Sequence, residues 1–122
     1  MEKIKNFTDL NSWKKGHELL LEIYQLSAGF PSSELFGLTS QMRRAALSVT
    51  SNLAEGFGRS STKEKLQFYN IALGSLTELQ NQIIASKDLK LITQKEFDSA
   101  WEKTIVVQKL TNGLVRSIRF PS

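Results

Sequence analysis

The stretch GLTSQMRRAALSVTSNLAEGFGR, from Gly37 to Arg59, decides the fold because its residues repeat with the period of an α-helix. At about 100° per residue, one face of this helix is apolar and a second face is polar. The apolar face holds Leu38, Met42, Ala45, Val49, Leu53 and Phe57. The polar face, called here the polar stripe, holds Gln41, Arg44, Ser48, Ser51, Asn52, Glu55 and Arg59. We therefore predict an amphipathic helix that buries one side and presents a regular polar stripe on another.

The composition of the whole chain is that of an ordinary folded protein. The 122 residues are 40% hydrophobic and 23% charged, which excludes the disordered class. Two prolines and seven glycines leave long stretches without turn residues, and this favours helices over the short strands of a small β-domain. The sequence predicts a single all-α domain spanning residues 1–122.

Four helices follow from the periodicity and from the capping signals. They are expected at about 10–29, 39–58, 62–87 and 94–118. The expected caps are Asp9 or Asn11 for the first helix, Thr39 for the second, and the capping boxes Ser61 with Glu64 and Thr93 with Glu96 for the others. Short connections between helices of this length favour antiparallel neighbours, so we predict an antiparallel up-and-down four-helix bundle.

The apolar arcs on the first, third and fourth helices are wider than one bundle core uses. If they stayed in water, the chain would expose more contiguous apolar surface than monomers usually do. We therefore predict that the bundle assembles as a homo-oligomer.

Few residues are available for chemistry. Cysteine is absent, which excludes disulfides, thiolate catalysis and Cys-ligated zinc. The one histidine, His17, shares its helix face with Trp13 and Leu20, so a packed histidine is the better interpretation. A single histidine cannot build a di-iron site or serve a Ser-His-acid set from within an apolar face, and no Gly-rich phosphate loop follows a strand. We predict no enzyme activity, no metal and no cofactor.

The beginning of the chain carries no targeting signal. MEKIKNFTDLNSW lacks the apolar core of a signal peptide, and no run approaches the ~20 apolar residues of a membrane span. We expect a cytoplasmic protein without a membrane partner.

Basic residues around the second helix suggest a nucleic-acid surface. The net charge is +4 and the isoelectric point is about 9.5. Arginine suits phosphate because its planar fork donates two parallel hydrogen bonds. The candidate phosphate contacts are Arg43, Arg44, Arg59 and Lys63. Arg43 lies about 100° from Arg44 on the helix and is expected to be the freer of the two to meet a partner.

A structural role competes with that interpretation. Ser48, Asn52 and Glu55 of the polar stripe fit a solvated face or a contact between helices or subunits. Glu55 can pair with Arg59 at i,i+4, and Asn52 at the border of the apolar face is placed to hydrogen-bond across helices. Gly56 interrupts the apolar face, and close approach of a neighbouring helix explains it without a ligand.

The stretches QMRRAALSVTSNLAEGFGRSS and FYNIALGSLTELQNQI closely resemble the bacterial four-helix-bundle proteins encoded in 23S rRNA intervening sequences. The resemblance extends along most of the chain, and Phe36 to Glu78 is its most specific part. It implies a small bundle that assembles as a ring, a homopentamer, and binds RNA or DNA, with no catalytic residues to transfer. It extends to the accessory protein of diversity-generating retroelements, which works with a reverse transcriptase and nucleic acid, so a protein partner is a further expectation.

Two functions remain open at this point. The first is a non-enzymatic, homo-oligomeric nucleic-acid-binding protein. The alternative is a structural or protein-interaction scaffold in which the polar stripe is a subunit contact.

Overall fold

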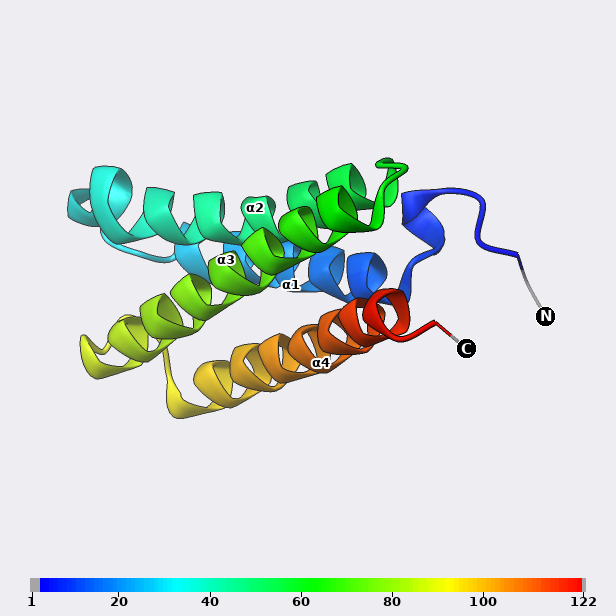
Figure 1. Cartoon of the computed structure of the whole chain (residues 1–122). Coiled ribbons are helices and arrows are strands. Elements are labelled where there is room, and N and C mark those ends of the chain that lie inside the picture. Colours follow the sequence, from blue (N-terminus) through cyan, green and yellow to red (C-terminus); the bar gives the residue numbers. More distant parts are fainter. Residues whose placement is uncertain (1–2, 122) are drawn as a thin grey trace.

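The computed structural model describes residues 3–121, and this part of the chain is built from helices without any strand. The four long helices are α1 (Asn11–Ala28), α2 (Ser40–Phe57), α3 (Thr62–Asp88) and α4 (Gln94–Arg119) (Figure 1). Short helical turns occupy Phe7–Asp9, Ser32–Glu34 and Leu35–Thr39. The all-helical prediction is confirmed, and the helix bounds differ from the expected ones by no more than one residue.

The helices surround one core, as a four-helix bundle requires. α2 packs against α1 and α3, and α4 packs against the same two helices. Their inward faces supply side chains that are almost wholly removed from water. The largest of these are Tyr69, Leu19, Ile23, Met42, Leu53, Leu76, Leu79, Ile83, Val49 and Val107. Both ends of the described chain lie at one end of the bundle, and the α1–α2 and α3–α4 connections lie at the other (Figure 1).

The capping signals of the last two helices are present. The backbone N–H of Glu96 donates to Thr93 Oγ1 over 3.1 Å, and the Thr93 N–H donates to Glu96 Oε1 over 2.8 Å. At α3 the Glu64 N–H donates to Ser61 Oγ over 3.1 Å, but the return contact comes from the Ser61 hydroxyl to Glu64 Oε1 over 3.2 Å. The capping box of α4 is thus confirmed. At α3 the Ser61 side chain caps the helix as predicted, but the bond from the Ser61 backbone N–H to the Glu64 side chain is replaced by one from the Ser61 hydroxyl.

The expected caps of the first two helices are wrong. Leu10 precedes α1 and offers no side-chain cap, while the Asp9 carboxylate accepts the N–H groups of Lys5 and Asn6 in the turn before it. Thr39 precedes α2 but makes no capping bond, because the chain enters α2 from the helical turn Leu35–Thr39. Backbone carbonyls of that turn replace a side-chain cap, as the Ser40 N–H donates to the Gly37 carbonyl.

Close approach of α2 and α3 explains the glycine in the apolar face of α2. A Cβ added to Gly56 would lie 2.6 Å from Tyr69 Cε1 and 3.1 Å from Phe68 Cβ. The predicted reason for this glycine is therefore confirmed. It lets the Tyr69 ring approach the α2 backbone closely.

Candidate functional site

The polar stripe of α2 contacts α3 at its middle, through Ser48, and at its end, through Arg59. Ser48 Oγ and Ser75 Oγ share a hydrogen bond of 2.8 Å that joins the two helices. Asn52 Nδ2 donates to the Ser48 carbonyl over 2.8 Å and to Ser48 Oγ over 3.1 Å. Asn52 thus bonds within its own helix, and the prediction that it reaches across helices is wrong. Ser48 makes the crossing contact, so the middle of the stripe is a hydrogen-bonded seam inside one chain.

Arg59 joins the end of α2 to the start of α3. Its guanidinium pairs with Glu55 at 3.0 Å, as the i,i+4 spacing predicted, and with Glu64 at 3.6 Å. It also lies over the Phe68 ring, with Cζ 4.7 Å from the centroid. Both carboxylates are at least half exposed, so each pair is a weak surface contact that still fixes the orientation of the arginine.

Arg43 and Arg44 have opposite environments, and the prediction about them is wrong. Arg43 Nε donates to Ser27 Oγ over 2.8 Å, and its guanidinium lies over the Tyr24 ring at 4.5 Å. Arg43 is half-buried, since the side of α2 that carries it packs against α1. Arg44 is exposed, and its guanidinium donates to Gln41 Oε1 of its own helix over 3.2 Å. Arg44 is the freer arginine.

The four candidate basic residues fall into two separate pairs. Arg43 and Arg44 lie in the first turns of α2, while Arg59 and Lys63 follow its end. At ~1.5 Å per residue, about 20 Å of helix separates the two pairs. Arg43 and Arg44 instead line a shallow hollow of about 360 Å³. The other residues around that hollow are Tyr24, Leu35, Thr39, Ser40 and Leu47.

The positive charge of the chain gathers at one end of the bundle. We define the basic end as residues 3–19, 49–75 and 107–121, which form the half containing both ends of the described chain (Figure 1). It holds ten basic and four acidic residues, a net charge of +6. The other half, residues 20–48 and 76–106, holds six basic and seven acidic residues, a net charge of −1. The basic residues of the basic end are Lys3, Lys5, Lys14, Lys15, Arg59, Lys63, Lys65, Lys109, Arg116 and Arg119.

This asymmetry is not evident along the sequence, where the basic residues of the basic end lie in three separate segments with acidic residues among them. It exists because the first half of α1 lies beside the second half of α2, as Gly16 against Thr50 shows. Within residues 3–121, the ion pairs of the basic end involve Lys15 with Glu18 and Arg59 with its two glutamates. Lys63 and Arg119 are exposed and belong to none of these pairs.

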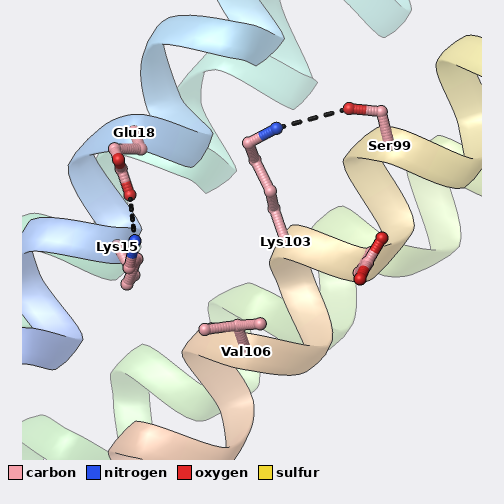
Figure 2. Close-up of a pocket in the computed structure, with 6 residues that line it drawn as sticks. Lys15, Glu18, Ser99, Lys103 and Val106 are labelled. Carbon is pink, nitrogen blue, oxygen red and sulfur yellow. Dashed lines mark hydrogen bonds and ion pairs between the residues drawn. The ribbon is translucent and has the colours of Figure 1, made fainter.

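A hollow of about 310 Å³ between α1 and α4 carries charges of both signs (Figure 2). Figure 2 shows Lys15 paired with Glu18 on α1 and Lys103 reaching Ser99 on α4, at 3.1 Å and 3.3 Å. Lys103 Nζ also pairs with Glu22 at 2.7 Å. Glu102 also lines the hollow, so its two lysines are matched by two glutamates of the lining and it offers no net positive charge to a phosphate.

The one histidine of the chain packs against an aromatic ring. His17 stacks on Trp13 with centroids 4.9 Å apart and planes at 11°, which is the packed role expected for it. No group of three or more His, Cys, Asp or Glu among residues 3–121 is arranged to hold a metal ion. None of the described helices is long and apolar enough to cross a membrane.

Two comparisons with known proteins find relatives of this chain. A family model described as 23S rRNA-intervening sequence protein matches residues 8–113. The chain is also similar to the crystal structure of a protein of unknown function from the S23 ribosomal protein family of Bacteroides thetaiotaomicron. The two are 20% identical with a TM-score of 0.80, and the match covers 86% of this chain and 95% of that one. At this identity the likeness shows the fold alone. No curated protein matches the chain.

Proposed function

The chain belongs to the 23S rRNA-intervening sequence protein family, and on this premise we propose that it is a non-enzymatic, homo-oligomeric protein that binds RNA or DNA through its basic end. The observation that carries this proposal is the net charge of +6 on one half of the bundle against −1 on the other. A concentrated positive field attracts the phosphate backbone and releases its counterions, and a scattered charge of the same size does so weakly. Arg59 and Lys63 lie within the basic end, whereas Arg43 and Arg44 do not.

The proposed assembly is a ring, a pentamer by the family resemblance, of antiparallel up-and-down bundles. Contacts between neighbouring helices support this topology. Ser27 bonds Arg43 and Gly16 faces Thr50, so residue numbers rise along α1 as they fall along α2. In a ring whose axis runs along the bundles, every basic end would lie on the same face, and the charge of each copy would add to that of the next.

An apolar surface on α1, α2 and the turn between them supports self-association. We define the apolar face as Leu21, Tyr24, Leu35, Phe36 and Leu47, all of which are exposed. Tyr24, Leu35 and Leu47 share the hollow that Arg43 and Arg44 also line. A second copy of the chain that covers this face would remove the apolar side chains from water, and the two arginines would then contribute to the subunit contact.

The second candidate function is a protein-interaction scaffold. Phe36 favours it, because phenylalanine is enriched in protein interfaces and this side chain is 92% exposed. In this version the contact surface is the apolar face and not the polar stripe, since Ser48 is already bonded to Ser75 of its own chain. Arg43 and Arg44, which line the hollow beside the apolar face, would then contact the protein partner, and the chain would not bind nucleic acid.

Binding of labelled RNA and DNA oligonucleotides at two salt concentrations tests the proposal. By fluorescence anisotropy we expect affinity to fall at least about tenfold between 50 and 200 mM salt, as ~two or more phosphate contacts require. If neither oligonucleotide binds, or if the affinity is the same at both salt concentrations, the nucleic-acid role is contradicted and the protein-interaction scaffold is favoured. Cleavage of either oligonucleotide in the presence of a divalent metal would contradict the non-enzymatic assignment.

A further inference from the structure

An exposed aromatic side chain stands within the basic end. Phe120 caps the C-terminal end of α4, and its backbone N–H donates to the Arg116 carbonyl over 2.9 Å. This bond fixes the backbone of Phe120, yet its side chain remains 77% exposed. A phenylalanine held in this way offers a flat apolar surface to something outside the chain.

Basic residues lie close to Phe120 along the chain and at the same end of the bundle. Arg116 and Arg119 occupy the last turn of α4, are exposed, and take part in none of the ion pairs between described residues. The segment with Lys3 and Lys5 lies at the same end of the bundle (Figure 1). The combination of an exposed aromatic ring with phosphate-binding cations is the one that single-stranded nucleic-acid binders use.

We infer that the basic end binds single-stranded RNA or DNA, with one base stacked on Phe120 and the flanking phosphates bound by Arg116 and Arg119. This inference rests on the proposed nucleic-acid function and adds the form of the strand. Bases of a duplex stack on one another and present only their edges, so an exposed ring gains nothing from a duplex. An unpaired base presents its face, and stacking on an aromatic ring strengthens binding regardless of sequence.

Leu89 provides the control because it is 61% exposed and lies in the α3–α4 connection at the opposite end of the bundle (Figure 1), outside the apolar face. The half that contains it has a net charge of −1, so a polyanion has no reason to gather there. Replacement of Phe120 or Leu89 by alanine removes an exposed apolar side chain without opening a cavity in the core. Loss of folding therefore does not complicate the comparison.

The experiment measures the affinity of the full chain for a labelled 12-nucleotide single strand and for the duplex of the same sequence. We expect the single strand to bind more tightly than the duplex. Phe120→Ala should weaken single-strand binding by roughly five- to 150-fold, and Leu89→Ala should change it less than twofold. Duplex binding should be unchanged by Phe120→Ala.

Two results overturn the inference while leaving nucleic-acid binding in place. They are equal affinity for strand and duplex, and a single-strand affinity that Phe120→Ala does not alter. If neither oligonucleotide binds, the proposed function fails and this inference fails with it. A third result also overturns the inference. If Phe120→Ala abolishes sedimentation with anionic phospholipid vesicles but leaves single-strand affinity unchanged, the ring contacts a membrane surface and not a base.

Discussion

Gly56 of α2 lies so close to Tyr69 of α3 that a Cβ on the glycine would stand 2.6 Å from Cε1 of the tyrosine ring. Tyr69 is 1% exposed, so the ring cannot swing into solvent to make room without opening the core. The contact sets the distance between α2, which carries the polar stripe, and α3.

Gly56→Ala should therefore destabilise the fold although alanine is the better helix former. We expect the free energy of unfolding to fall by ~1–3 kcal/mol, because the strain of overpacking exceeds the ~1 kcal/mol gained in helix propensity. Urea denaturation followed by circular dichroism measures this.

Gly74 in α3 is the matched control, since nothing lies within 4 Å of a Cβ built there. Gly74→Ala should raise the free energy of unfolding by ~0.5–1 kcal/mol. An equal stabilisation by both substitutions would show that α2 and α3 are not held together by this contact.

The burial of Tyr69 makes the fold sensitive to alkaline pH. Loss of solvation raises the pKa of the Tyr69 hydroxyl above its ordinary value of 10.0. The unfolded chain thus releases this proton at lower pH than the folded chain does. The stabilising contribution is complete below about pH 10 and is lost as the pH rises through the folded pKa.

Tyr69→Phe removes that group and should reduce the loss of stability between about pH 8 and about pH 11. Urea midpoints of the two proteins at both pH values give the comparison. If the midpoints fall by the same amount in both, ionisation of Tyr69 does not contribute to alkaline unfolding.

Arg43 should matter for stability and Arg44 should not. Arg43→Ala removes the hydrogen bond to Ser27 and the contact with the Tyr24 ring, which together contribute ~1–2 kcal/mol to a half-buried site. Arg44→Ala removes an exposed side chain and should change the free energy of unfolding by less than ~0.5 kcal/mol. Thermal unfolding that is shifted equally by the two variants would mean that Arg43 is not tied to α1.

A charge on the apolar face should dissociate the proposed oligomer. Leu47 is about half exposed, so Leu47→Glu leaves the core intact while placing a carboxylate in the proposed subunit contact. We expect light scattering to give the mass of a multimer for the natural chain and of a monomer, 13.8 kDa, for the variant.

Ile71→Glu serves as the comparison, because Ile71 has similar exposure on α3 and lies outside the apolar face. It should leave the mass of the assembly unchanged. Dissociation by Ile71→Glu alone would place the subunit contact on α3.

Local signals were enough to predict the helices and the reason for one glycine. The capping box of Thr93 and Glu96 can be predicted because it depends only on two residues that are three positions apart. The role of Gly56 can be predicted because glycine destabilises a helix interior, so its presence there indicates that a neighbouring helix comes close. The cap at Thr39 failed because the turn Leu35–Thr39 runs directly into α2, and the sequence of that turn lacks helical periodicity.

The candidate site was harder to predict because its residues depend on neighbouring helices. A helical wheel places Arg43 and Arg44 correctly relative to each other, but it cannot say that α1 covers the side of Arg43. The basic end is likewise invisible until the helices are placed side by side, since Lys3, Lys63 and Arg119 are distant along the chain. The placement of Phe120 at the basic end also becomes evident only when the helices are packed together.

The salt dependence of nucleic-acid binding by two charge-matched variants tests the central claim most directly. Lys63→Ala with Arg119→Ala removes two exposed cations from the basic end. Lys90→Ala with Lys95→Ala removes two exposed cations from the other half, outside the apolar face and its hollow. The slope of the logarithm of affinity against the logarithm of salt concentration should become shallower by about 1.5 for the first variant and stay unchanged for the second. Equal slopes for both variants, or a change confined to the second, would contradict binding through the basic end.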